Sequence, residues 1–202
     1  MGLRQDKKDQ IRQRLYETST DLFRERGFEA TRVKDIIDRV GVSEATFFNY
    51  FPTKEAVLHH SAAQSKQFYG VFLQHLLARA DEPATDRLRE LARVMASVVV
   101  ADRQFMASVV GRTSLFWDAT GTAKATDLEN FDLLAGLFRQ GQQTGDISSG
   151  HDPLQLAEVF IAIFTLTITN WLTGWWGDIG ELEPRILTAL DVMLTGCRKQ
   201  AN

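Results

Sequence analysis

Residues 31–55, TRVKDIIDRVGVSEATFFNYFPTKE, decide the fold of this chain. Thr31 is expected to cap a short helix with apolar residues at helical spacing, and Gly41 ends that helix because glycine enters the left-handed region without steric cost. Ser43 is expected to cap a second short helix, which Pro52 prevents from continuing. Two short helices joined by a turn that contains glycine form a helix-turn-helix, whose second helix lies in the major groove of DNA.

The stretch from about Ile11 to Leu58 resembles the DNA-binding domain of the TetR/AcrR family of transcriptional regulators. The resemblance rests on the end of a long first helix, LFRERGFEATRV, on the turn GVSEATFF and on the exit NYFPTKEAVL. It implies an all-α fold of about nine helices. An N-terminal three-helix helix-turn-helix DNA-binding domain would occupy residues 1–55. A C-terminal helical bundle for dimerisation and ligand binding would occupy residues 56–202.

Helical periodicity also runs through the rest of the chain, and no strand or internal repeat is expected. Gly27 and Gly41 mark helix ends, whereas Thr53, Asp152 and Pro184 mark helix starts. Besides the two short helices of the DNA motif, the expected helices span residues 8–26, 54–80, 85–102, 103–110, 122–144, 153–176 and 184–199.

The charge distribution fits a DNA-binding head on an acidic body. The chain of 202 residues has a net charge of −3. Residues 1–55 hold 11 basic and 10 acidic residues, a net charge of +1, whereas residues 56–202 hold 12 and 16, a net charge of −4. Such a contrast between the two ends of a chain indicates a nucleic-acid partner for the more basic end.

Other features exclude several classes of protein. The single cysteine, Cys197, excludes an intrachain disulfide and a cysteine-cluster metal site. The N-terminus is charged throughout, so no secretory signal is expected. The longest apolar stretch, residues 154–176, is interrupted by Glu158 and Asn170 and falls short of a membrane span. These features predict a soluble, cytoplasmic protein.

The second helix of the motif is expected to have two faces. Phe47 and Phe51 lie four residues apart and should pack on the core of the head. Asn49 carries an acceptor and donors, so it can bind the N6/N7 edge of adenine. Lys54 fits a phosphate contact at the start of the following helix. The candidate DNA-binding residues are Thr31, Arg32, Lys34, Ser43, Glu44, Ala45, Thr46, Phe48, Asn49, Tyr50 and Lys54.

Two of these residues depart from the pattern that the resemblance implies. The family usually places a basic or small residue directly after the cap, where this chain has Glu44. The family usually has a tyrosine where this chain has Phe48, which cannot donate a hydrogen bond to phosphate. Glu44 would repel a phosphate but can accept a hydrogen bond from a cytosine amine.

The last two helices are the candidates for a dimer interface. Helix-turn-helix proteins bind near-palindromic operators as pairs, and two helices from each chain would form a four-helix bundle. The helix expected at residues 153–176 is apolar nearly all round, so one side would form the interface and the other a pocket wall. The candidate interface residues are Phe160, Ile163, Ile186, Leu190 and Met193.

The aromatic residues of the body suggest a cavity for a small, mostly apolar effector. Each of them taken alone is also compatible with an ordinary core position. Polar residues interleaved with the aromatics would orient the effector. The candidate lining residues are Phe68, Phe72, Gln104, Phe105, Phe116, Trp117, Phe131, Phe138, Phe164, Thr167, Asn170 and Trp171.

These features predict a ligand-responsive transcriptional regulator, a repressor that binds its operator as a homodimer and is released by the effector. The alternative is an architectural DNA-binding protein that binds no ligand and has little sequence preference. An enzyme is the third class, and the sequence has no G-x-S-x-G, no phosphate-binding glycine loop and no H-E-x-x-H. His59 and His60 are adjacent rather than four residues apart, so neither a metal nor a cofactor is expected.

Overall fold

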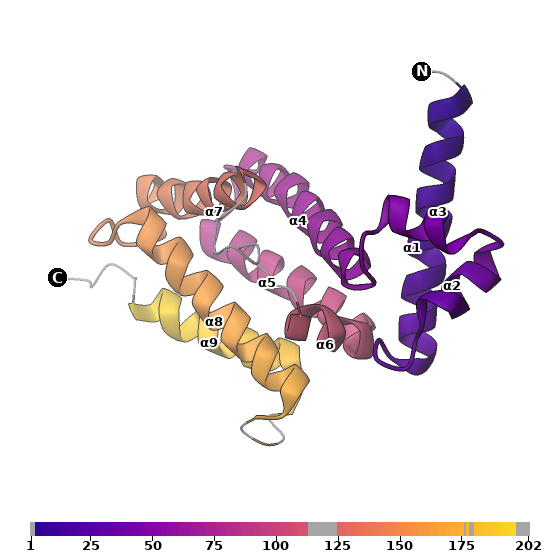
Figure 1. The fold of residues 1–202 in the computed structure, drawn as a ribbon. Helices are drawn as coiled ribbons and strands as arrows, with labels where there is room; N and C mark the ends of the chain where they lie inside the picture. The colour runs from indigo at the N-terminus through magenta and orange to yellow at the C-terminus, as the bar shows by residue number, and fades with distance from the viewer. Residues whose placement is uncertain (1–2, 113–124, 176, 178–179, 197–202) are drawn as a thin grey trace. The chain divides into compact units, whose positions relative to one another are not determined.

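A computed structural model of the chain describes residues 3–112, 125–175, 177 and 180–196. These residues form helices, and none of them lies in a strand, which confirms the all-α prediction (Figure 1). In chain order the helices are α1 (Leu3–Arg26), α2 (Val33–Val40), α3 (Glu44–Tyr50), α4 (Glu55–Ala78), α5 (Ala84–Ala101), α6 (Arg103–Arg112), α7 (Ala125–Thr144), α8 (Pro153–Thr173) and α9 (Leu182–Gly196).

The chain divides into two compact units. We call the first, residues 1–63 and 102–113, the head unit, and the second, residues 64–101 and 114–202, the body unit. The head unit therefore includes the first turns of α4 and the short helix α6, beyond the domain boundary expected after residue 55. That expected boundary stays a prediction about functional domains.

Local capping chemistry sets several helix ends as the sequence predicts. The Ser43 side chain accepts a hydrogen bond from the Thr46 amide (3.2 Å), and Gly41 ends α2 in the left-handed conformation with φ of 78°. Asp152 accepts from the amides of Leu154 and Gln155 at the start of α8. The end of that helix differs from expectation, because Gly174, with φ of 66°, stops it three residues earlier.

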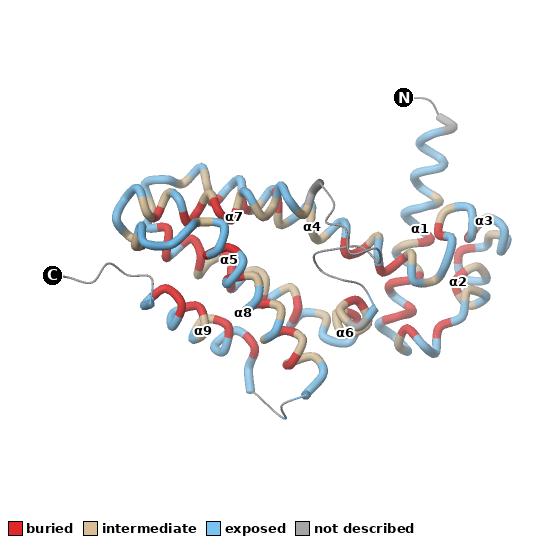
Figure 2. Tube along the Cα trace, turned by 60° about the vertical axis from the view of Figure 1, so that its left-hand side comes forward, coloured by how far each residue is buried: buried red, intermediate tan, exposed pale blue. Residues whose placement is uncertain are grey.

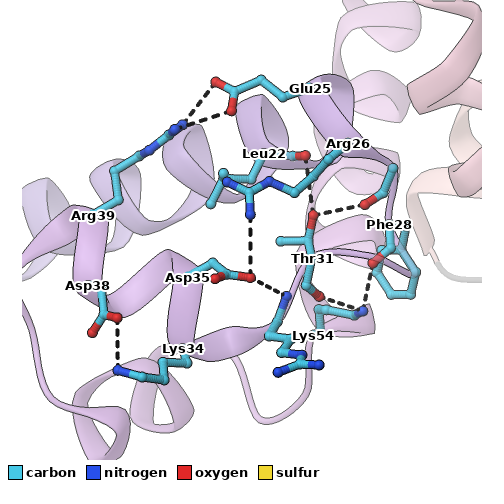
Figure 3. Close-up of polar contacts among 12 residues, drawn as sticks. Leu22, Glu25, Arg26, Phe28, Thr31, Lys34, Asp35, Asp38, Arg39 and Lys54 are labelled. Atoms are coloured by element: carbon cyan, nitrogen blue, oxygen red, sulfur yellow. Dashed lines mark hydrogen bonds and ion pairs between the residues drawn. The ribbon is translucent and has the colours of Figure 1, made fainter.

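The predicted cap of α2 is wrong. Arg32 is the N-cap residue, and Thr31 is fully buried. The Thr31 hydroxyl donates to the carbonyl oxygens of Leu22 (3.2 Å) and Gly27 (2.8 Å), so it ties the chain that enters α2 to the end of α1 (Figure 3). The carboxylate of Asp35 accepts from the backbone amide of Arg32 (2.9 Å) and takes over the stabilisation of the first turn.

A single apolar core holds the three helices of the DNA motif in place. Phe47 and Phe51 are buried in it, with 0% and 2% of their surface exposed, as the sequence predicts. The helix α6 contributes two residues to the same core, which makes α6 part of the head unit. The buried core residues are Leu15, Leu22, Phe23, Phe28, Ile36, Val40, Phe47, Phe51, Val57, Leu58, Ala62, Phe105 and Val109.

In the body unit, α8 packs against both α7 and α9, and α5 packs against α7, α8 and α9 (Figure 2). By length and composition α8 could cross a membrane, so the expectation that this stretch falls short of a membrane span is wrong; 33% of its most apolar window is buried inside the protein. Buried Arg87 on α5 donates to the carbonyl oxygen of Leu76 (2.9 Å) and to Oε1 of Gln140 (2.7 Å). Side chains of α5 and α7 thereby hold the last turn of α4.

Candidate nucleic-acid interface

The helix α3 presents a solvent-facing side, whose orientation is fixed by buried Phe47 and by buried Phe51 at the C-cap. Phe48 is 41% exposed, and its ring meets the ring of Phe47 edge-on with centroids 5.4 Å apart. The exposed residues on this side are Glu44, Ala45, Phe48 and Asn49. We call these four residues the reading face. The Asn49 amide can bind the N6/N7 edge of adenine, and the Phe48 ring can contact the methyl group of thymine.

Two other candidates for DNA binding, Ser43 and Thr46, take part in the N-terminal cap of α3. Ser43 is the N-cap residue, and its hydroxyl lies 2.8 Å from the hydroxyl of Thr46, which is half-buried. The pair closes the first turn, so these hydroxyls position the reading face. Tyr50, at the end of α3, is half-buried and packs against the core of the head.

Lys54 is held within the head unit. Its ammonium donates to the carbonyl oxygens of Phe28 (2.7 Å) and Thr31 (2.9 Å), and it lies 4.1 Å from the centre of the Phe28 ring. Figure 3 shows these contacts closing the loop between α1 and α2. In this structure Lys54 fixes the entry to the DNA motif. The expected phosphate contacts of Lys54 and of buried Thr31 stay predictions.

Most charges of the DNA motif are paired with one another. Arg39 binds Glu25 at 2.9 Å, and this hydrogen bond lowers the pKa of the Glu25 carboxyl. Lys34 binds Asp38 at 2.9 Å, which raises the pKa of the lysine. These pairs are exposed and therefore contribute little to stability, so Lys34 remains able to turn toward a phosphate.

Arg32 is the strongest phosphate candidate in the motif. It is exposed and stands at the N-cap of α2, where helix amides favour an anion. Among the described residues 25–51, the other cations each lie within 4 Å of a carboxylate, whereas no such pair is present for Arg32. Sequence reasoning missed Arg14, which donates to the carbonyl oxygen of Val40 (3.1 Å) at the end of α2. A contact across 26 residues leaves no periodic signal in the sequence.

The structure separates the residues expected to line an effector cavity. Phe105 lies in the core of the head unit, and Gln104 is exposed on the same short helix, so neither belongs to the body. Phe138 and Phe164 are buried core residues of the body unit. Phe116 and Trp117 lie outside the described residues.

The remaining cavity candidates lie on the helices of the body unit. On α4, Phe68 is 51% exposed and stacks on half-buried Phe72 with an interplanar angle of 1°. On α7, Phe131 is half-buried. On α8, the indole nitrogen of Trp171 donates to the carbonyl oxygen of Gly180 (3.0 Å). Thr167 and Asn170, also on α8, lie beside α9.

Four of the five residues expected at a dimer interface face the chain's own core instead. Phe160, Ile186, Leu190 and Met193 are all buried in the body unit, so of the five candidates only Ile163 remains partly exposed. Helical spacing had identified the apolar side of α9 but not what covers it. On the opposite side of α8 and α9 lies a groove of about 750 Å³, lined by Ile163, Leu166, Thr167, Asn170, Glu181, Pro184, Arg185, Thr188 and Ala189.

Comparison with known proteins agrees with this geometry. The sequence model of one protein family, the bacterial regulatory proteins of the tetR family, matches residues 15–60 of this chain. The transcriptional regulator RutR of Escherichia coli is 31% identical over 134 residues, 63% of this chain and 62% of RutR. The repressor DhaR of Mycobacterium sp. strain GP1 is 26% identical over 158 residues, 75% of this chain and 77% of DhaR.

A solved structure extends the similarity to almost the whole chain. It is that of Thermus thermophilus FadR, a TetR family transcriptional repressor in complex with lauroyl-CoA. The two chains are 25% identical with a TM-score of 0.72, and the match covers 95% of this chain and 97% of FadR.

The fold and the reading face of α3 define a helix-turn-helix DNA-binding protein. The chain belongs to the TetR family of bacterial transcriptional regulators.

Proposed function

We propose that this protein is a repressor that binds a near-palindromic operator as a homodimer and leaves it when an apolar effector binds. The observation that carries the proposal is the reading face of α3, four exposed residues on a short helix whose other side is anchored by Phe47 and Phe51. A helix so anchored enters the major groove as a fixed unit, and Arg32 at the start of α2 supplies a flanking phosphate contact.

The outward side of α8 and α9 forms the proposed dimer interface. Leu166 and Val159 on α8 are 48% and 46% exposed, and Val192 on α9 is 70% exposed. Ile163 and Leu166 also line the groove between the two helices. A second copy that packs on this side would cover these apolar residues and complete a four-helix bundle. The pair of heads then reads two half-sites roughly 34 Å apart.

The proposed effector carries a long acyl chain. The similar FadR of Thermus thermophilus was solved with lauroyl-CoA, an acyl thioester. In this chain, the stacked rings of Phe68 and Phe72 on α4 provide an apolar surface of the kind that an acyl chain contacts. Because α4 contributes residues to both units, an effector that binds here acts on the helix that joins them. The protein leaves the operator if the effector binds more tightly to an arrangement of helices that does not fit the operator than to one that does.

Selection of bound DNA from a random pool tests the DNA half of the proposal. Wild-type protein should enrich a near-palindrome, and Asn49→Ala should cost roughly 1–3 kcal/mol of binding free energy and relax preference at one position of each half-site. A wild-type pool without any motif would support the architectural alternative, which predicts a small ratio of specific to nonspecific affinity.

The tryptophans provide a test of the effector half. All four, Trp117, Trp171, Trp175 and Trp176, lie in the body part of the sequence. Lauroyl-CoA should change their fluorescence over the concentration range that releases operator DNA, and by linkage the operator should weaken lauroyl-CoA binding by the same factor. Phe72→Ala should lower the affinity for lauroyl-CoA, whereas the matched control Val71→Ala, one residue away and 68% exposed, should not. Equal responses of the two variants would place the effector elsewhere.

A further inference from the structure

The acidic residues of the DNA motif are paired with basic side chains, with one exception. Four of the five acidic residues in positions 25–51 lie within ion-pair distance of a lysine or arginine: Glu25 with Arg39, Glu29 with Arg112, Asp35 with Arg26, and Asp38 with Lys34. Among the described residues, no such pair is present for Glu44. The exception lies on the reading face.

Glu44 occupies the first position of α3 and is exposed. It lies one helical turn before exposed Phe48 and next to Ala45, so its carboxylate belongs to the surface proposed to enter the groove. The reading face contains no lysine or arginine that could neutralise this carboxylate. Glu44 therefore brings an unneutralised negative charge toward DNA, which is itself negative.

We propose that Glu44 determines sequence specificity by requiring a cytosine at one position of each half-site. The inference rests on the proposed function, since it needs α3 in the major groove. A carboxylate only accepts hydrogen bonds, and most groups in that groove are acceptors too. The donors are the N4 amine of cytosine and the N6 amine of adenine. Adenine presents its N7 acceptor beside N6, which repels the second carboxylate oxygen, so cytosine is the better partner.

The same carboxylate rejects other bases. At guanine it would face the acceptors O6 and N7, and at thymine the acceptor O4. In either case the carboxylate loses water without gaining a donor, and that loss is the penalty for a buried charge without a partner. Phe48, one turn further along α3, cannot form hydrogen bonds but can contact the methyl group of thymine. The half-site is thus expected to contain a cytosine with a thymine close by.

A structural role for Glu44 is the competing explanation. An acidic residue in the first turn of a helix interacts favourably with the helix dipole, whether or not DNA is present. In that case, replacing Glu44 would change the thermal stability of the head and would leave base preference as it was. The two roles are therefore separated by the composition of the selected DNA.

DNA selection with wild type, Glu44→Ala and Glu44→Gln tests the proposal. Wild type should enrich cytosine at one position of each half-site. Glu44→Ala should lose about ten-fold of the discrimination at that position and keep the rest of the motif. Glu44→Gln should shift the preference from cytosine to adenine, because a side-chain amide matches the N6/N7 edge. Thermal melting of each variant verifies that α3 remains folded.

Glu55→Gln is the matched control. Glu55 is an exposed acid in the first turn of α4, so its replacement removes the same charge at the same kind of helix position, off the reading face. This variant should bind all sequences slightly better and keep the wild-type motif. If Glu44→Ala behaves in the same way, or if the wild-type motif has no cytosine that depends on Glu44, the inference is overturned. A wild-type pool without a motif would instead overturn the proposed function.

Discussion

The head unit and the body unit differ in how completely they bury their apolar side chains. Among the described residues, Phe48 is the only exposed large hydrophobic residue of the head unit, and it lies on the reading face. The described part of the body unit has nine such residues: Phe68, Val71, Val100, Leu128, Leu154, Val159, Leu166, Trp175 and Val192. Exposed apolar surface of this extent marks sites of interaction. The described part of the head unit thus exposes a large apolar side chain only on the reading face, whereas the body unit exposes several, which fits the proposed dimer interface and effector site.

The largest effect is expected from a charge at the proposed dimer interface. Leu166→Glu places a carboxylate where the second copy would cover it, and the resulting desolvation penalty should separate the dimer. Light scattering should then give the mass of one chain, 22.8 kDa, instead of twice that value. Operator affinity should fall by about 10²–10⁴-fold, because the two heads no longer bind as one linked pair.

Val71→Glu is the control for that experiment. Val71 is 68% exposed on α4, so the same charge is introduced on the body unit but away from α8 and α9. This variant should remain dimeric and bind the operator with the affinity of the wild type. A monomeric Val71→Glu, or a dimeric Leu166→Glu, would contradict the assignment of the interface.

The next largest effect tests whether the head has a core of its own. Phe23 is fully buried there, and Phe23→Ala should destabilise the head by roughly 3–5 kcal/mol, because it removes buried apolar surface and leaves a residual cavity. Circular dichroism should show an additional unfolding step at lower temperature. Tryptophan fluorescence should report that step weakly, since the four tryptophans belong to the body part of the sequence. Phe138→Ala, in the body core, should lower the fluorescence transition instead.

Smaller effects are expected from replacing single basic side chains of the head, and they distinguish a lysine that stabilises the fold from an arginine that binds DNA. Lys54→Met removes the ammonium that donates to the Thr31 carbonyl oxygen and leaves the Phe28 carbonyl oxygen with only the longer bond from the Thr31 amide (3.3 Å), and should cost roughly 1–3 kcal/mol of head stability. Unlike the phosphate contact expected from the sequence, this arrangement keeps the ammonium on backbone carbonyl oxygens, so the effect of Lys54→Met on the salt dependence of operator binding should be negligible. Arg32→Ala should do the opposite, reducing the slope of log affinity against log salt by about one for each phosphate that the arginine neutralises. If Lys54→Met reduces that slope as Arg32→Ala does, Lys54 also binds phosphate.

The head was the more predictable unit because short-range chemistry determines it. Gly41 and Ser43 act on their immediate neighbours, so sequence alone located the turn and the start of α3. The inward positions of Phe47 and Phe51 followed from helical spacing. The roles of Thr31 and Lys54 did not follow. Their partners are carbonyl oxygens up to 26 residues away in sequence, and backbone groups leave no pattern in the residue types.

The body was less predictable because its helices are apolar on more than one side. Periodicity shows that α8 and α9 carry apolar faces. It does not show whether the rest of the same chain or a second copy of the chain covers each face. Periodicity therefore assigns Phe160 and Leu190 to an interface, whereas the folded chain buries both. Exposed Leu166 and Val192 became candidates only when the structure showed which sides of the two helices remain open.

The smallest effect is a pH dependence confined to the head. Burial, and then the positive charge of Arg12, lowers the pKa of His60 below its ordinary value of 6.5. The ring of His60 meets the rings of Tyr16 and Phe51 edge-on, and Nδ1 lies 3.4 Å from the Arg12 guanidinium. His60 therefore binds its proton more weakly in the folded head than in the unfolded chain, so protonation of His60 favours unfolding.

Because the pKa of His60 is lowered in the folded head, the stability of the head should change between that lowered pKa and the ordinary value. Head stability should be unaffected by His60 above the ordinary pKa, fall as pH drops from there toward the lowered folded-state pKa, and level off below it. Melting followed by circular dichroism between about pH 7.5 and 5 should show this loss in wild type and much less of it in His60→Gln, whose side chain does not titrate in that range. The exposed neighbour His59 provides the control, because His59→Gln should keep the wild-type pH dependence. An identical pH dependence in wild type and His60→Gln would show that other groups of the head control its acid sensitivity.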